Sequence, residues 1–366
     1  MATATRPAEG ARKRVRVKAG LRSLPVKLGT PPMEAKLVDV LPDEEGWQFE
    51  PKWDGFRCLA YRAGPAVELQ SKSGKSLARY FPEMVDALRI LPLDRFVLDG
   101  ELAILSGAAL SFDALQNRLH PAESRVRKLA VEAPAMFILF DCLATEMDGS
   151  LLHTPLMRRR TALERFFASL GDQPSLRLTP YTREVATARS WLDKARGSLD
   201  GVVAKRVDGG YMPGERAMLK VKLLRTADCV VGGFRYASDS DLVGSLLLGL
   251  HDEAGLLHHV GFTSTIKDEE RTALTRRLER LIGPPGFTGD APGAPSRWST
   301  ERSAEWQPLK PRLVVEVKYD QVTGNRFRHG TRLLRWRPDK KPAHCTCDQL
   351  QREAPPAKLV TEVIGR

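Results

Sequence analysis

Hydrophobic and polar residues alternate with a period of two in several short stretches, a pattern typical of half-buried β-strands. From Trp47 to Tyr61 the alternation is broken by Asp54-Gly55, a turn signal, so the sequence predicts a strand, a turn and a second strand. Other strands are predicted over residues 96–105, 135–142, 199–205 and 217–223. Helical periodicity predicts helices over residues 81–91, 156–170 and 185–195.

A second group of short strands begins near residue 227. Strands are predicted over residues 229–236, 245–251, 256–262 and 312–319, the last of them being the last clear strand of the chain. An amphipathic helix is predicted over residues 267–282, and a loop over the Gly- and Pro-rich residues 283–295. Short strands with one helix and one loop indicate a small barrel.

Length and composition place the chain among globular proteins. Its 366 residues exceed one typical hydrophobic core, so we expect two domains. There is no apolar run long enough to span a bilayer and no apolar N-terminal signal, so we expect a cytoplasmic protein without a membrane partner. The five scattered cysteines predict free thiols, and His344, Cys345 and Cys347 lack the second ligand pair of a zinc site.

The balance of charge favours a nucleic-acid partner. Lys and Arg number 57 against 45 Asp and Glu, a formal net charge of +12, and a basic protein attracts polyanions. Residues 1–24 are strongly basic, contain few apolar residues and are predicted to be disordered. Whether this tail is a phosphate-binding arm or only a solvated segment is left open by the sequence.

Five short segments carry residues suited to nucleotide chemistry. They are Lys-Trp-Asp-Gly-Phe-Arg at 52–57, Leu-Asp-Gly-Glu at 98–101, Phe-Ile-Leu-Phe-Asp at 137–141, Asp-Gly-Val-Val-Ala-Lys at 200–205 and Lys-Val-Lys at 220–222. Their order and spacing resemble motifs I, III, IIIa, IV and V of ATP-dependent DNA ligases, and Arg-Pro-Asp-Lys at 337–340 resembles motif VI. The resemblance covers nearly the whole chain after the tail and is strongest to small bacterial ligases of the LigC type.

Lysine chemistry supports the first motif independently. An amine attacks phosphorus only when it is unprotonated, and the reference pKa of lysine is about 10.4. We expect burial and nearby cations to lower the pKa of Lys52. Lys220 and Lys222 are suitable cations, because a strand projects residues two apart from one face. The resemblance places both on the α-phosphate; the alternative is a basic, solvent-facing strand edge.

The resemblance also implies a divalent metal. Phosphoryl transfer needs a cation such as Mg²⁺ or Mn²⁺ to neutralise phosphate charge. Glu101 is assigned to the ribose and the metal, and Asp200 to the metal. The family usually has Glu at the position of Asp200, so the shorter side chain implies a contact of a different kind, such as one through water. The alternative for Asp200-Gly201 is a plain turn.

Other roles follow from the resemblance alone. Phe140 is expected to stack on adenine, although an all-apolar strand also fits a core residue. Glu50 is placed beside the adenine amino group and Lys205 at the nucleotide. Arg57 is assigned to the ribose and then to the nick phosphate. Lys72 stands where the family has an arginine that grips the 5′-phosphate, and a lysine lacks the bidentate geometry of an arginine.

The sequence therefore predicts an α/β nucleotidyltransferase domain of the ATP-grasp-like type over residues 25–225. An all-β oligonucleotide-binding (OB) barrel follows over residues 226–350, and a tail over residues 351–366. Arg337 and Lys340 are expected to bind the β- and γ-phosphates of ATP. ATP is favoured over NAD because only a short tail precedes the Lys52 region, where NAD-dependent ligases carry an extra domain.

The predicted function is ATP-dependent sealing of nicked duplex DNA by a monomer acting at the bacterial nucleoid. A role in repair or end joining is expected, and the sequence does not choose between a repair polymerase or primase and end-joining proteins as partners. Two alternatives remain: an RNA ligase or RNA-capping nucleotidyltransferase using the same lysine chemistry, and an inactive OB-type nucleic-acid-binding protein.

Overall fold

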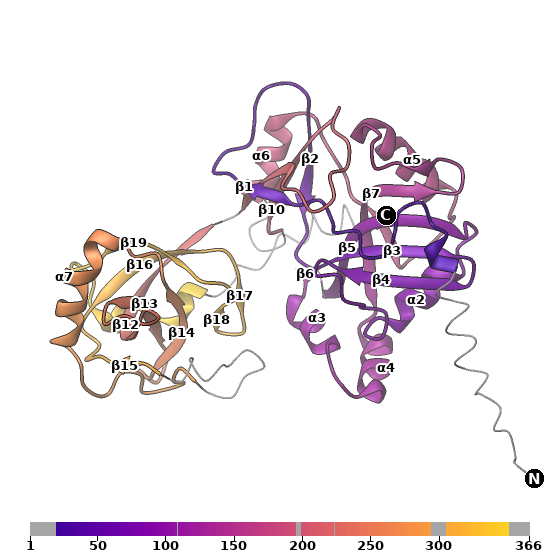
Figure 1. Cartoon of the computed structure of the whole chain (residues 1–366). Coiled ribbons are helices and arrows are strands. Elements are labelled where there is room, and N and C mark those ends of the chain that lie inside the picture. Colours follow the sequence, from indigo (N-terminus) through magenta and orange to yellow (C-terminus); the bar gives the residue numbers. More distant parts are fainter. Residues whose placement is uncertain (1–19, 108, 195–198, 223, 294–304, 351–366) are drawn as a thin grey trace, which may run out of the picture. The chain divides into compact units, whose positions relative to one another are not determined.

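The structure, a computed structural model, describes residues 20–107, 109–194, 199–222, 224–293 and 305–350. The described residues divide into two compact units, one up to Lys222 and the other over residues 224–350 (Figure 1). The first strand of the second unit, β12, begins at Arg225, so the predicted border between residues 225 and 226 falls just inside this strand.

A mostly antiparallel seven-stranded sheet forms the larger part of the first unit. Its main path runs β4-β3-β5-β7-β8, while β6 pairs with β5 and β9 pairs with β7. The strands are β3 (Phe56–Ala63), β4 (Ala66–Ser71), β5 (Arg95–Ser106), β6 (Ala109–Leu110), β7 (Ala135–Thr145), β8 (Gly149–Ser150) and β9 (Leu176–Leu178).

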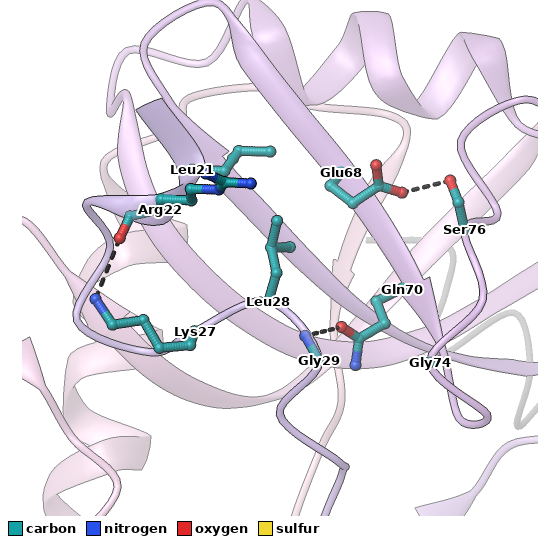
Figure 2. A pocket seen from close by; sticks show the side chains of 9 residues that line it. All are labelled: Leu21, Arg22, Lys27, Leu28, Gly29, Glu68, Gln70, Gly74 and Ser76. Carbon is teal, nitrogen blue, oxygen red and sulfur yellow. Dashed lines mark hydrogen bonds between the residues drawn. The ribbon is translucent and has the colours of Figure 1, made fainter. Parts of the chain in front are cut away.

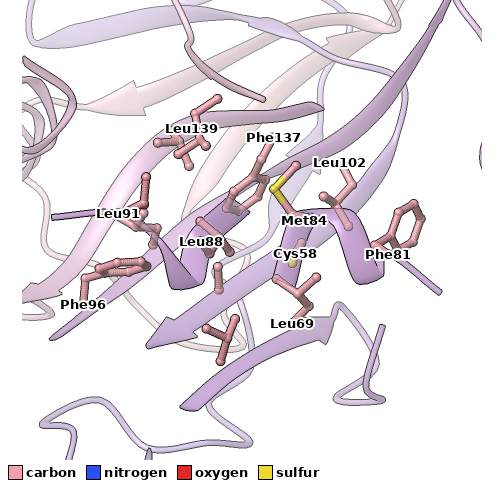
Figure 3. Packing of buried hydrophobic residues seen from close by; sticks show 14 of the residues in the cluster. Cys58, Leu69, Phe81, Met84, Leu88, Leu91, Phe96, Leu102, Phe137 and Leu139 are labelled. Carbon is pink, nitrogen blue, oxygen red and sulfur yellow. The ribbon is translucent and has the colours of Figure 1, made fainter. Parts of the chain in front are cut away.

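One face of this sheet is covered by helices. Apolar side chains from β3, β4, β5 and β7 pack there with side chains of α2 and α5 in one core, part of which is drawn in Figure 3. The helices of this part are α2 (Pro82–Arg89), α3 (Phe112–Arg118), α4 (Glu123–Glu132) and α5 (Leu156–Ala168). Cys58 belongs to this core, so its neighbour Arg57 projects from the opposite face of β3.

A four-stranded sheet completes the first unit. Its order is β1-β11-β10-β2, and α6 (Val185–Lys194) contacts β2 and β10. The strands are β1 (Ala35–Leu37), β2 (Trp47–Lys52), β10 (Gly201–Arg206) and β11 (Met218–Lys222). Phe49, Val202 and Val221 pack with Ala188 of α6 in one cluster. Because side chains alternate along a strand, the opposite face carries Glu50 and Lys52 of β2, Lys205 of β10, and Lys220 and Lys222 of β11.

In its described residues, the second unit consists of a six-stranded antiparallel sheet and one α-helix, α7 (Asp268–Glu279). The main path is β14-β13-β12-β16-β19, and β15 pairs with β12. Leu274 and Leu278 of α7 belong to its core, together with Val230 and Phe234 of β12. The strands are β12 (Arg225–Tyr236), β13 (Val243–His251), β14 (Leu257–Thr263), β15 (Gln307–Pro308), β16 (Val314–Tyr319) and β19 (Arg332–Trp336), with a separate β17 (Val322–Thr323) and β18 (Arg326–Phe327) hairpin. Two 3-10 turns follow, at Pro342–His344 and Cys347–Leu350.

Two expectations from the pattern are wrong. Residues 312–319 are not the last strand, because β19 follows; most of its side chains are exposed, which leaves little hydrophobic signal. The predicted tail is too long, because Leu21 and Leu24 are buried in the first unit. Residues 1–19 and 351–366, the rest of the predicted tails, lie outside the described residues. Within the described ranges, the helices are all too short or too polar to cross a membrane.

Candidate active site

Lys52 is the last residue of β2, and the chain around it is held by packing. The next residue, Trp53, is buried, and its indole Nε1 donates a hydrogen bond of 2.9 Å to Thr179 Oγ1. Within the turn, a Cβ at Gly55 would lie 2.2 Å from the Leu102 carbonyl oxygen, so only glycine permits this approach to β5. The Lys-x-Asp-Gly turn is therefore fixed against the large sheet.

Strand register brings the predicted lysines together. Gly201 of β10 pairs with Lys52 on one side and with Lys222 on the other. Asp200, which is buried, lies 2.5 Å from Lys52 Nζ and 3.6 Å from Lys222 Nζ through its Oδ2 atom. Two residues further along β10, Val203 pairs with Glu50 and with Lys220. The predicted nucleophile, acid and cations thus lie on one side of the small sheet.

Glu101 of β5 is the second acid near Lys52. Burial raises its pKa to about 7, and the positive charges of Lys52 and Arg57 act in the opposite direction. Arg57 pairs directly with Glu101 in the β3–β5 register. A buried carboxylate with a raised pKa is one that a bound cation stabilises in its ionised form.

The expectation that Lys52 has a lowered pKa is wrong for the free protein. Burial does lower the pKa of Lys52, but Asp200 and Glu101 outweigh this effect, so the pKa lies above the ordinary value. The crowding of cations acts on Lys220 instead: burial, followed by Lys52 and Lys222, lowers the pKa of Lys220. Without substrate, Lys52, the predicted nucleophile, is therefore an ammonium ion paired with Asp200.

Glu50 and Lys205 form a buried ion pair on neighbouring strands. The distance from Lys205 Nζ to Glu50 Oε2 is 2.7 Å, and Gln48 Nε2 donates a hydrogen bond of 2.8 Å to the other carboxylate oxygen. Lys205 Nζ also donates to the carbonyl oxygen of Phe140 at 3.3 Å. Both oxygens of Glu50 are thus oriented by donors, and the pair is tied to β7 of the large sheet.

Phe140 lies at an irregularity in β7. Asp99 pairs with Asp141 and Gly100 with Leu139, which leaves Phe140 as the extra residue of a bulge. From Ala135 to Ala144 every residue of β7 is buried except Phe140. Its ring centroid lies 4.6 Å from the Arg57 guanidinium carbon and 4.8 Å from Lys205 Nζ. The ring therefore lies outside the core and among the cations.

Arg57 is held by a residue that the sequence reasoning did not single out. Its Nε and Nη2 atoms each lie 2.5 Å from a carboxylate oxygen of Asp99, which is fully buried. Tyr211 Oη donates a third hydrogen bond to Asp99, of 2.6 Å. Asp99 lies two residues before Glu101 in an apolar strand. Because residues two apart in a strand share a face, the sequence could have indicated that Asp99 lies on the same face as Glu101. Tyr211 lies outside the named strands and helices and carried no such signal.

Lys72 projects from the turn after β4. Its side chain is 60% exposed, and Nζ lies 3.0 Å from Glu34 Oε2. Beside this turn, a cavity of about 470 Å³ is bounded by Gly74, by β4 and by the segment from Leu21 to Gly29 (Figure 2). No predicted site residue lines this cavity, so it is separate from the Lys52 cluster.

Arg337 and Lys340 belong to the second unit and have acidic partners there. Asp228 of β12 lies 2.7 Å from Arg337 Nη1 and 3.4 Å from Lys340 Nζ. Asp339 contacts the other side of the guanidinium, 2.8 Å from Nη2. Asp228 is another residue that no motif indicated.

The sequence matches two protein-family models. The ATP dependent DNA ligase domain covers residues 32–222, and the ATP dependent DNA ligase C terminal region covers residues 239–340. The chain belongs to the ATP-dependent DNA ligase family. The family predicted from the motifs is thereby confirmed, as is the fold class of this ligase, a nucleotidyltransferase domain followed by an OB-type domain.

Named relatives extend over most of this ligase. DNA ligase C1 of Mycolicibacterium smegmatis is 45% identical over 89% of this chain and 95% of its own length. DNA ligase C of Mycobacterium tuberculosis is 43% identical over 90% of this chain and 96% of its own length. A solved structure from a study of Lig E DNA ligases covers 83% of this chain and 100% of its own, with a TM-score of 0.52 and 16% identity, and shows the same fold.

Proposed function

We propose that this chain seals nicks in duplex DNA, during repair or end joining, through a covalent lysyl-AMP intermediate formed on Lys52. The observation that carries the proposal is the convergence of Lys52, Asp200 and Lys222 at one register position, with Glu101 acting on the same lysine. An amine nucleophile, two carboxylates and additional cations are the groups that phosphoryl transfer to an amine requires.

The first step needs an unprotonated Lys52. Asp200, Glu101 and Asp54 raise its pKa in the free protein, so their negative charge has to be offset before the amine can attack. Mg²⁺ commonly takes one or two carboxylates together with water and phosphate oxygens, and Glu101 with Asp200 fits this donor set. A divalent cation, Mg²⁺ or Mn²⁺, would neutralise phosphate charge when bound.

In this step the Nζ lone pair of Lys52 forms a bond to the α-phosphorus of ATP. The bond from that phosphorus to the pyrophosphate oxygen breaks, and pyrophosphate leaves with its electron pair. Lys220 and Lys222 are assigned to the α-phosphate, where their charge stabilises the transition state. Lys222 is already held 3.6 Å from Asp200, next to the nucleophile.

The base and ribose are assigned to the neighbouring cluster. Phe140 offers a partly exposed ring for stacking, since the bulge removes it from the core. Glu50 has both oxygens oriented by donors and accepts from the adenine amino group, while Lys205 completes the nucleotide site. Arg57, held in place by Asp99, binds the ribose and later the nick phosphate.

In the second step AMP moves from Lys52 to the 5′-phosphate of the nick, which Lys72 contacts. In the third step the 3′-hydroxyl attacks that phosphate and AMP leaves. Arg337 and Lys340 are assigned to the β- and γ-phosphates during the first step only. On this proposal residues 25–225 form the adenylation domain and residues 226–350 the DNA-binding OB domain of a monomer that acts in the cytoplasm at the nucleoid.

Covalent labelling tests the proposal. The wild type, Lys52→Ala and Lys36→Ala are incubated with α-labelled ATP, GTP or NAD, and labelled protein is measured on a denaturing gel. Lys36 is a matched control, because it lies exposed on β1 and pairs with the neighbour of Lys220. We expect label from ATP alone, lost only in Lys52→Ala. Label from GTP would indicate a capping enzyme, and no label would indicate an inactive binding protein. Assays on nicked DNA and nicked RNA then identify the polymer.

A further inference from the structure

Asp228 contacts both cations that the proposed function assigns to the pyrophosphate end of ATP. One carboxylate oxygen lies 2.7 Å from Arg337 Nη1 and the other lies 3.4 Å from Lys340 Nζ. The Asp228 side chain is 13% exposed, so water screens these contacts less than at an open surface. Because one carboxylate spans both cations, it sets the distance between them.

The backbone of Asp228 is itself clamped by a side-chain amide. Its N–H donates to Gln349 Oε1 at 2.9 Å, and its carbonyl oxygen accepts from Gln349 Nε2 at 3.1 Å. Tyr319 Oη donates in turn to the carbonyl oxygen of Gln349 at 3.2 Å. On its other side Asp228 pairs with Glu316 of β16. The carboxylate therefore projects from a backbone position that is fixed on both sides.

The second acid on Arg337 differs in its surroundings. Asp339 contacts Arg337 Nε at 3.0 Å and Nη2 at 2.8 Å, but its side chain is 63% exposed. The backbone N–H of Arg337 is held separately by the Val314 carbonyl oxygen at 2.8 Å. An exposed carboxylate is more easily displaced by a more highly charged phosphate than Asp228, whose side chain is less exposed and whose backbone is held on both sides.

We propose that Asp228 is a positioning residue that holds Arg337 and Lys340 at a fixed spacing to receive the two terminal phosphates of ATP, with Asp339 as the partner that the phosphates replace. The inference rests on the proposed role of Arg337 and Lys340 in lysine adenylation. Long cationic side chains lose substantial conformational entropy when they are ordered. Ordering them before ATP arrives lowers the cost of binding, which is the effect of preorganisation.

Asp228→Asn tests this with nearly unchanged shape and one charge removed. Glu316→Gln is the comparison variant: Glu316 occupies the same rung of the sheet and also attracts Arg337, but its ion pair of 2.6 Å is with Arg335. Three properties are measured for each variant. They are the single-turnover rate of adenylation as a function of ATP concentration, the rate of sealing of a nick that already carries AMP, and the temperature of thermal unfolding. We expect Asp228→Asn to raise the half-saturating ATP concentration about tenfold or more, without changing sealing or unfolding. Glu316→Gln should raise this concentration by less than about threefold, because its carboxylate has no direct ion pair with Arg337 or Lys340 among the described contacts.

A double-mutant cycle distinguishes the two levels of the proposal. Asp228→Asn is combined with Arg337→Ala and Lys340→Ala, and its effect should vanish there if Asp228 acts through these cations. If Arg337→Ala and Lys340→Ala leave adenylation intact, the assigned role of the motif fails. If they impair adenylation but Asp228→Asn does not, only the inference on Asp228 fails. Equal losses of adenylation and sealing, a lowered unfolding temperature in Asp228→Asn, or an undiminished effect in the combined variant would make Asp228 a structural residue and overturn it.

Discussion

Gly201→Ala perturbs the register position at which the lysines converge, without altering a charged group. Gly201 has φ = +146°, and a Cβ there would lie 2.0 Å from the Val221 carbonyl oxygen and 3.0 Å from Lys222 Cα. Cβ atoms are essentially never found closer than 3.0 Å to such atoms, so β10 and β11 must separate by about 1 Å, the difference between 3.0 and 2.0 Å. Lys220 and Lys222 move with β11.

A displacement of about 1 Å in a group that orients the reacting atoms costs roughly 100-fold in rate, or about 3 kcal/mol in the barrier. The strained backbone adds a loss of roughly 1–3 kcal/mol in the free energy of unfolding. We therefore expect Gly201→Ala to slow single-turnover adenylation of Lys52 about 100-fold at saturating ATP, while the protein remains folded at low temperature.

Gly283→Ala is the control for backbone strain. Gly283 has φ = +150°, but its Cβ would meet only the flexible end of Lys310, at 3.3 Å, in the second unit. It shares the strain of Gly201→Ala without the collision, so we expect a loss of stability with adenylation near the wild-type rate. Circular dichroism melts and labelled-adduct kinetics are measured on both variants. Adenylation by folded Gly201→Ala within about threefold of the wild type would refute the argument from geometry.

Four further predictions follow from the site, the tail and the core of the second unit. Lys52→Arg should form no covalent adduct with labelled ATP, as for Lys52→Ala, because a guanidinium stays protonated; an adduct in either variant would contradict the assignment. Lys72→Arg should keep or improve nick sealing, since the exposed side chain has room for a bidentate contact, and a tenfold loss of nick affinity would show a site built around lysine. A deletion of residues 1–19 removes the tail and keeps the buried Leu21. It should flatten the slope of log affinity for DNA against log salt concentration by roughly 0.9 for each DNA phosphate that the tail neutralises. An unchanged slope would mean that the tail is only a solvated segment. Burial, together with Arg326, lowers the pKa of His259 to about 3, so the unfolded chain binds an extra proton below pH 6.5 and stability falls on acidification. Urea unfolding at pH 7.5 and at pH 5 measures this fall in the free energy of unfolding. The fall should be about 2 kcal/mol smaller in His259→Gln than in the wild type, and an equal fall in both proteins would contradict the prediction.

Much of the fold was predictable because its central strands have strong hydrophobic patterns. The strands that carry Lys52, Glu101 and Lys220 were all predicted within a few residues of their observed bounds. β19 was missed because Arg and Leu share a mostly exposed strand, where burial imposes no pattern. The buried Leu21 and Leu24 were missed because seven basic residues dominate the composition around them.

In the candidate site, the sequence predicted the residues but not their ionisation or their supporting contacts. Motif spacing predicted which side chains to consider, but the ionisation of Lys52 depends on distances that no spacing contains. The 2.5 Å contact with Asp200 reverses the direction expected for its pKa. Supporting residues such as Asp99 and Asp228 contact motif residues from other strands, and pairing across a sheet is a property of the fold rather than of a local sequence.

The ion pair between Lys52 and Asp200 has a consequence for the lifetime of the enzyme in a cell. Aldehydes, acyl phosphates and carbon dioxide modify lysine only as the free amine, and a raised pKa keeps that form scarce. The buried carboxylate beside Nζ also limits the directions from which a small electrophile can approach. If Lys52 is the nucleophile of the proposed function, the ion pair that keeps its amine protonated in the free protein also shields that amine from such modification until ATP binds.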